Sequence, residues 1–193
     1  MRSTPLHPVA RLPEEWSASL ASRGERSFTA KQVFHWIHRR GVLDPAAMTN
    51  LPARLREHLV AEGLGEVLTP ERVHRSEDGT RKLLLRLHDG ATIETVLLPS
   101  VSGPGSQAQL DADAAASDDE DEDDAADAGA APRVRVTQCI STQVGCAMGC
   151  GFCASGVAGL KRHLGAEEIA GQVLLGRAML EEGEELRNVV YMG

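Results

Sequence analysis

The sequence predicts an α/β fold in which a helical N-terminal part is followed by a small antiparallel β-region and the start of a parallel βαβ layer. Three observations lead to this prediction. Apolar residues recur at helical spacing within residues 27–62, two Asp-Gly pairs separate short β-type runs in residues 71–98, and residues 133–192 read as strand, long helix and strand. A long helix between two strands is typical of a parallel βαβ unit.

The N-terminal part is expected to contain two amphipathic helices. The first ordered element starts near Ser27 or Thr29, either of which can cap a helix, and it ends at Gly41. Its apolar residues follow the i, i+3, i+4, i+7 rule: Ala30, Val33, Phe34 and Ile37. The second helix runs over Pro52–Glu62, with leucines spaced four residues apart on one stripe. We therefore expect residues 1–70 to form a helical module.

Residues 71–100 are expected to form a small antiparallel β-region. Asp78-Gly79 and Asp89-Gly90 are strong signals for tight hairpin turns, and each pair lies beside β-type runs. The predicted strands are Glu71–Arg75, Arg81–His88 and Ala91–Leu98, and Pro99 closes the meander.

The net charge of -8 comes from one segment, residues 101–132. This segment holds ten acidic residues and no Lys or Arg, whereas the rest of the chain has 20 basic and 18 acidic residues. Asp118–Asp124 is an unbroken acidic run that repels itself and has little apolar area to bury, so we expect the segment to be disordered. An interaction tail and a tolerated surface insertion are both compatible with it.

The last part, residues 133–193, is predicted to begin an α/β layer. Arg133–Ile140 reads as a strand, Gly165–Glu182 as a helix, and Asn188–Met192 as a second strand. Gly165 is an acceptable N-cap, with Glu168 three residues further on.

The cysteines and the N-terminus indicate a cytoplasmic protein. Met1–Leu12 has no apolar core typical of a signal peptide. Val136–Leu160 is uncharged, but its glycines, cysteines and polar residues are unlike a membrane helix. All four cysteines lie between positions 139 and 153, which favours metal or redox chemistry over a disulfide framework.

Three of these cysteines form the candidate metal site. Cys146, Cys150 and Cys153 have C-x3-C-x2-C spacing, and the glycines between them let the chain curl. Three thiolates on a 4Fe–4S cube leave one iron open, and an open iron can chelate the amino and carboxylate groups of S-adenosylmethionine (AdoMet). The alternative is a structural zinc site, but that usually shows two distant C-x2-C pairs and only one pair is present.

The role of Cys139 stays open at the level of residues alone. It precedes Cys146 by seven residues, so an extended chain places it roughly 20 Å away. A fold-back would allow it to be a fourth ligand, whereas a buried strand cysteine is the more common role.

Residues 138–156, Gln-Cys-Ile-Ser-Thr-Gln-Val-Gly-Cys-Ala-Met-Gly-Cys-Gly-Phe-Cys-Ala-Ser-Gly, resemble the cluster loop of the RlmN family of radical AdoMet methyltransferases. The resemblance covers nearly all of the chain from Phe28 onward except the acidic segment. Other segments that resemble the family are residues 28–41, 48–51, 78–82, 93–99, 159–162 and 187–193.

The resemblance implies that residues 133–193 begin a radical AdoMet (β/α) barrel that is incomplete in this chain. It implies methylation of carbon 2 of an adenine in 23S rRNA and in tRNAs, with a 4Fe–4S cluster and AdoMet as cofactors. Residues 1–70 would be an RNA-binding type of module. An electron donor such as flavodoxin or ferredoxin, a monomeric state and no membrane partner are also implied.

The resemblance further assigns roles to single residues. One AdoMet methylates a cysteine near the enzyme's C-terminus, and a second AdoMet yields the radical that activates this methyl group for addition to adenine. By position, Glu94 matches the residue that accepts the ring proton, and Cys139 matches the second cysteine, which forms a transient disulfide. Phe152 matches the aromatic position against AdoMet's adenine. From the residues alone, Glu94 is a solvated strand residue and Phe152 a core residue.

The sequence also departs from the family pattern. It ends at Gly193, where the family continues into a Gly-Glu-Pro motif, and it has no fifth cysteine to carry the methyl group. We therefore expect a fragment that cannot methylate RNA alone, with an acidic segment that places negative charge near the RNA path. Two other readings stay open: a sister enzyme that methylates carbon 8, and a non-catalytic iron–sulfur, zinc or RNA-binding remnant.

Overall fold

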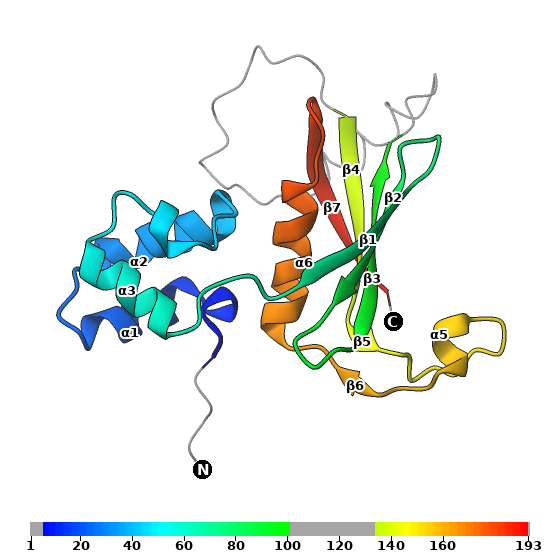
Figure 1. The fold of residues 1–193 in the computed structure, drawn as a ribbon, viewed down its shortest axis with the longest axis horizontal. Coiled ribbons are helices and arrows are strands. Elements are labelled where there is room, and N and C mark those ends of the chain that lie inside the picture. Colours follow the sequence, from blue (N-terminus) through cyan, green and yellow to red (C-terminus); the bar gives the residue numbers. More distant parts are fainter. Residues whose placement is uncertain (1–5, 101–133, 193) are drawn as a thin grey trace, which may run out of the picture.

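The computed structural model describes residues 6–100 and 134–192. A group of short helices lies beside a twisted sheet, and helix α6 lies between the two (Figure 1). The fold is therefore mixed α/β, with helices first and the sheet after them, as the sequence predicts. The acidic segment predicted to be disordered, 101–132, lies outside the described residues.

Six short helical elements form the N-terminal module. They are η1 (Pro8–Ala10), α1 (Pro13–Ala21), α2 (Ser27–Phe34), η2 (His35–Arg39), η3 (Pro45–Ala47) and α3 (Ala53–Ala61). The two predicted helices are confirmed as α2 and α3, and α2 continues directly into the π-helical turn η2. The N-cap of α2 is Arg26 rather than Ser27 or Thr29.

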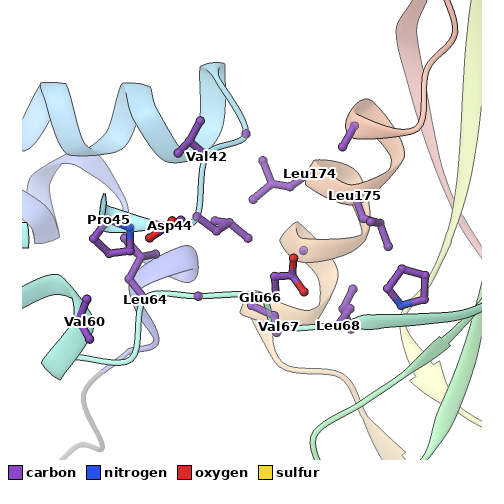
Figure 2. A pocket seen from close by; sticks show the side chains of 16 residues that line it. Val42, Asp44, Pro45, Val60, Leu64, Glu66, Val67, Leu68, Leu174 and Leu175 are labelled. Carbon is purple, nitrogen blue, oxygen red and sulfur yellow. The ribbon is translucent and has the colours of Figure 1, made fainter. Parts of the chain in front are cut away.

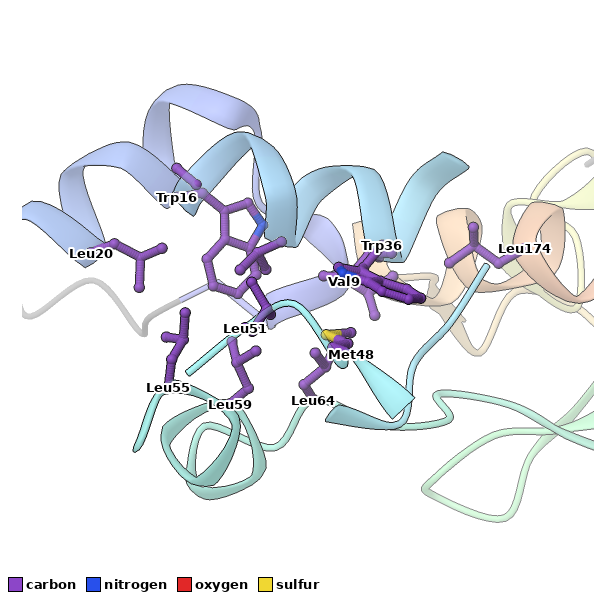
Figure 3. Packing of buried hydrophobic residues seen from close by; sticks show 13 residues of the cluster. Val9, Trp16, Leu20, Trp36, Met48, Leu51, Leu55, Leu59, Leu64 and Leu174 are labelled. Carbon is purple, nitrogen blue, oxygen red and sulfur yellow. The ribbon is translucent and has the colours of Figure 1, made fainter. Parts of the chain in front are cut away.

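The expectation that ordered structure begins near Ser27 is wrong, because α1 precedes it. Pro13 occupies the first turn of α1, where a missing backbone N–H costs nothing, and Glu15 accepts a hydrogen bond from the backbone N–H of Leu12 at 2.8 Å. Trp16 and Leu20, one turn apart, are fully buried (Figure 3). They pack in the core of the module together with Val9, Val33, Ile37, Met48, Leu51, Leu55 and Leu59.

The sheet has five strands in the order β1-β2-β3-β4-β7. Their bounds are β1 (Thr69–Arg75), β2 (Arg81–Arg86), β3 (Thr92–Pro99), β4 (Val134–Ser141) and β7 (Glu184–Met192). The three predicted strands of the β-region are confirmed as the antiparallel run β1-β2-β3. β3 also pairs antiparallel with β4, so the β-region and the last part of the chain share one sheet. The predicted domain boundaries stay a prediction.

β4, α6 (Ala166–Ala178) and β7 form the predicted parallel βαβ unit. The backbone N–H of Gly165 donates to Glu168 Oε2 at 2.9 Å, which confirms the predicted helix start. The helix was expected to reach Glu182 but ends at Ala178, and β7 already begins at Glu184. The turn between them uses Gly183 at φ 81°, a conformation that suits glycine.

Helix α6 belongs to two cores at once. Leu174 packs into the core of the helical module, whereas Ile169, Leu175 and Met179 pack against the sheet. Burial on both sides explains why its sequence lacks a single apolar stripe. No helix among the described residues is long and apolar enough to cross a membrane.

A largely apolar cavity of about 570 Å³ lies where the helical module meets α6 (Figure 2). Its walls come from the 41–45 turn, the 64–70 connection and α6, with Leu64, Val67 and Leu174 among the lining residues. None of the predicted site residues lines it. This cavity therefore belongs to the joint between the two parts of the fold.

Candidate metal and catalytic site

The three motif cysteines lie in one loop at the carboxyl end of β4 (Figure 1). We call residues 145–161 the cysteine loop. It connects β5 (Gln143–Val144) to β6 (Arg162–His163), which pair antiparallel and close its base. Two further backbone hydrogen bonds tie its ends, from the N–H of Cys146 to Gly159 O at 3.3 Å and from the N–H of Lys161 to Val144 O at 2.9 Å.

Glycines let the cysteine loop close tightly. At Gly145, with φ 77°, a Cβ atom would lie 1.8 Å from the carbonyl oxygen of Gly159. At Gly156 a Cβ atom would lie 2.8 Å from the backbone nitrogen and oxygen of Cys150. Because backbone atoms block both places, only glycine fits them without a shift of the loop. Gly156 belongs to the short helix α5 (Ala154–Val157), which Cys153 precedes as N-cap.

The three thiols share the loop but are not gathered at one point. All four cysteines of the chain are free and half-buried. Within residues 6–100 and 134–192, no three His, Cys, Asp or Glu side chains form a group able to hold a metal ion. The predicted ligands Cys146, Cys150 and Cys153 are therefore brought into one loop, and the structure does not place them in a coordination arrangement.

The donor set of the loop nevertheless fits a cluster with one open iron. Residues 145–161 contain three cysteines and no His, Asp or Glu, so the loop offers three sulfur ligands and no fourth ligand. A structural zinc site takes four protein ligands, whereas a radical AdoMet cluster leaves one iron for a substrate. Phe152, the predicted contact of AdoMet's adenine, is 95% exposed beside Cys153.

An ion-pair cluster fixes the returning arm of the cysteine loop. Arg162, in β6, donates two hydrogen bonds of 2.8 Å to the buried carboxylate of Glu168 and one of 2.7 Å to Asp89 Oδ2. The Arg162 hydrogen bond is the main cause that lowers the pKa of Asp89 to about 2. Burial opposes ionisation of Glu168, but Arg162 and the Gly165 N–H outweigh it and lower the pKa of this carboxyl.

Sequence reasoning missed this cluster, although each member carried another signal. In the sequence, Asp89 belongs to a turn signal, Glu168 to a helix-start signal, and Arg162 to a segment that resembles the family. Arg162 is 73 positions from Asp89 and 6 positions from Glu168, so only the fold brings the three together.

Glu94 and Cys139 lie on the same face of the sheet. Neighbouring residues of β3 and β4 pack toward α6, so the alternate residues point away from that helix. Cys139 pairs with Val96, two residues beyond Glu94. We call this side of the sheet, opposite α6, the open face. Glu94 is half-exposed there, and Lys82 Nζ lies 3.0 Å from its Oε1.

Comparisons with known proteins place the chain among RNA methyltransferases of related sequence. Residues 13–63 match a family model described as the ribosomal RNA large subunit methyltransferase N-terminal domain. All of the chain is 95% identical to half of a dual-specificity RNA methyltransferase RlmN from Sorangium cellulosum. Another RlmN, from Lawsonia intracellularis, is 37% identical over 94% of the chain and 44% of that protein.

A solved structure gives the same result in three dimensions. It is a crystal structure of a radical SAM methyltransferase from Sphaerobacter thermophilus, 34% identical to this chain, with a TM-score of 0.73. The match covers 97% of this chain and 47% of that one. The chain thus spans about half the length of the curated relatives that it matches. Over that span, the chain belongs to the RlmN family.

Proposed function

We propose that this chain supplies the cluster-binding loop and part of the catalytic sheet of a radical AdoMet enzyme that methylates carbon 2 of an adenine in 23S rRNA and in tRNAs. The observation that carries the proposal is a loop with three free thiols and no fourth ligand at the carboxyl end of β4. The relatives described as dual-specificity RNA methyltransferases support the substrate class.

Cys146, Cys150 and Cys153 are the proposed ligands of a 4Fe–4S cluster. When bound together with AdoMet, the cluster supplies the electron that cleaves AdoMet. The chain's own contribution is one loop that carries all three thiols, with glycines at its turns and its base held by β5 and β6. The exposed ring of Phe152 is available to stack against the adenine of AdoMet.

Glu94 and Cys139 are the proposed catalytic residues of the open face. Glu94 takes the proton that leaves carbon 2 of the adenine, and Lys82, 3.0 Å away, orients its carboxylate. Cys139 is a free thiol on the same face and is proposed to form the transient disulfide that releases the methylated base. Its partner would be the methyl-carrying cysteine, which is not one of the chain's four cysteines.

The proposed partners follow from the same reaction. The substrates are 23S rRNA and tRNA, and a one-electron donor such as flavodoxin or ferredoxin reduces the cluster. The relatives' description as RNA methyltransferases supports the RNA substrates. We propose a monomer.

A fusion protein tests the function directly. The chain is joined to the part of its 95% identical Sorangium cellulosum relative that it does not cover. After anaerobic cluster reconstitution, the fusion is incubated with reductant, labelled AdoMet and protein-free rRNA. We expect 2-methyladenosine in the digested RNA, and none from Cys150→Ala or from the 193-residue chain alone. Label in 8-methyladenosine would instead support the carbon-8 reading, and no label at all would contradict the proposal.

A further inference from the structure

Two glutamine side chains are fully buried between β4 and α6. Gln138 comes from β4 and Gln172 from the middle of α6, and each is 0% exposed. A buried amide costs free energy unless its donors and acceptors are paired, whereas a leucine would fill similar space without that requirement. The buried amides therefore point to a role that an apolar side chain does not fulfil.

The Gln172 amide holds the carboxyl end of β4 at two points. Its Oε1 accepts a hydrogen bond from the backbone N–H of Ser141 at 2.9 Å, and its Nε2 donates to the carbonyl oxygen of Ser141 at 2.9 Å. Ser141 is the last residue of β4, and the cysteine loop follows four residues later. The side chain of Gln172 on α6 thus pairs with the backbone of β4 at the residue where this strand ends.

The same network reaches the backbone of both proposed catalytic residues. Ser141 Oγ donates to the carbonyl oxygen of Glu94 at 2.7 Å, which joins β4 to β3. In the other direction, Thr95 Oγ1 donates to the carbonyl oxygen of Cys139 at 2.8 Å. Gln138 Nε2 extends the network by donating to Thr95 Oγ1 at 3.0 Å and to the backbone carbonyl of Gln172 at 2.7 Å, whereas Gln138 Oε1 has no hydrogen-bond partner among the described residues.

Helix α6 is shaped to admit this network. A Cβ atom at Gly176 would lie 2.3 Å from Gln138 Oε1, so the absence of a side chain there makes room for the buried amide. Gly176, four residues after Gln172, is itself buried. A glycine within a helix lowers its stability relative to alanine, which makes this accommodation specific rather than incidental.

We propose that Gln172 is a positioning residue: its side-chain amide holds the end of β4 and thereby sets how the Cys139 thiol and the Glu94 carboxylate are presented on the open face. The inference rests on the proposed function for the roles of those two residues. The positioning itself is a property of the free chain. It is therefore measurable without a cluster, AdoMet or RNA.

The test isolates the thiol of Cys139. With alanine at positions 146, 150 and 153, Cys139 is the chain's one remaining cysteine, and its reaction with N-ethylmaleimide is followed by mass spectrometry. We expect Gln172→Met to speed this reaction at least about fivefold, because the loss of one buried hydrogen bond already increases local opening by about that factor and this substitution removes both bonds to Ser141. Hydrogen exchange at the Ser141 amide should accelerate with it.

Thr95→Val is a second variant, which removes only the hydroxyl that holds the Cys139 carbonyl, and it should have the same effect. Leu174→Met on the same helix and Thr92→Val on the same strand are matched controls and should react at the parental rate. Circular dichroism checks that each variant is folded. Parental rates in both test variants overturn the proposal, and so does an equal acceleration in the controls.

In the fusion described above, Gln172→Met should lower the amount of methylated adenosine per AdoMet cleaved by about fivefold, because the same opening misplaces both catalytic groups. If Gln172 only stabilises the fold, Gln172→Met should lower the amount of methylated adenosine and the amount of cleaved AdoMet by the same factor. An unchanged ratio of the two would therefore also overturn the proposal. If the parental fusion methylates nothing, the proposed function fails, while the alkylation rates still decide the positioning role.

Discussion

Backbone hydrogen bonds at the start of α5 act on the thiol of Cys153. The backbone N–H of Gly156, and after it that of Ser155, favour the thiolate and lower the pKa of Cys153 below its ordinary value. The thiolate is the form that binds metals. The turn into α5 therefore prepares one of the three proposed ligands before any iron is present.

Iron content distinguishes ligands from other cysteines. We expect the chain reconstituted anaerobically with iron and sulfide to be brown and to hold about four irons, as a Cys-ligated 4Fe–4S cluster requires. Cys146→Ala, Cys150→Ala and Cys153→Ala should each lose most of the iron. Cys139→Ala serves as the matched control and should keep it. A colourless protein with one bound zinc would contradict the cluster.

For single residues, the sequence predicted contacts between near neighbours in the chain and missed contacts between distant positions. Cys146, Cys150 and Cys153 lie within eight consecutive residues, so their shared loop could be predicted from spacing alone. Glu94 and Cys139 share one face because β3 pairs with β4. Residues 100–133 separate these strands in the sequence, and neither strand carries a local signal for the pairing. Gln138 and Gln172 are also joined only by the fold.

Among the elements, the helices and strands with strong end signals were predicted well. The Asp-Gly turns located β1, β2 and β3, and leucine spacing located α3. Helix α1 was missed because its nine residues contribute only two fully buried side chains, too few to form a pattern. The end of α6 was predicted too late because apolar residues continue past Ala178, where they pack on the sheet from a turn.

The carboxylate of Glu168 on α6 holds Arg162, the residue that follows the cysteine loop. We expect Glu168→Gln to lower the free energy of unfolding by about 1–3 kcal/mol, since it weakens charge-assisted hydrogen bonds from Arg162. Urea unfolding monitored by circular dichroism measures this change. Glu57→Gln, an exposed substitution on α3, is the matched control and should have almost no effect. An equal loss in both would contradict the role of the ion pair.

The same ion pairs predict how stability depends on pH. Asp89 has a folded-state pKa of about 2, and the pKa of Glu168 is also below its ordinary value. A lowered folded-state pKa gives stability that is present above the ordinary pKa and is lost as the pH falls toward the folded value. We therefore expect the urea midpoint to fall between about pH 4 and pH 2, and to fall less steeply in Asp89→Asn. Parallel curves would contradict this assignment.

In the whole molecule, α6 joins the helical module to the sheet. Near its end, Arg177 donates hydrogen bonds to the carbonyl oxygens of His38 at 2.6 Å and Arg39 at 3.0 Å. These are carbonyls at the C-terminal end of η2, where a cation is favourable. Burial first, and the Arg177 charge second, lower the pKa of His38. One side chain therefore connects the two cores.

Removing this connection should be visible in both parts. We expect Arg177→Ala to lower the free energy of unfolding by about 1–3 kcal/mol and to raise the pKa of His38 toward its ordinary value. Thermal unfolding and an NMR titration of His38 measure the two effects. Arg177→Lys should recover only part of the stability, because lysine lacks the two-pronged geometry. Arg54→Ala, an exposed change on α3, should alter neither quantity.

The two ends of β4 connect to different parts of the chain. Its start, Val134, lies near Pro99 at the end of β3, since Pro99 pairs with Val136. Its far end, Ser141, leads to the cysteine loop roughly 25 Å away along eight strand residues. The connection between β3 and β4 thus enters the sheet at the end remote from the loop. A change in the length of this connection should therefore leave the geometry of the thiols unaltered. A reporter or purification domain can be inserted there.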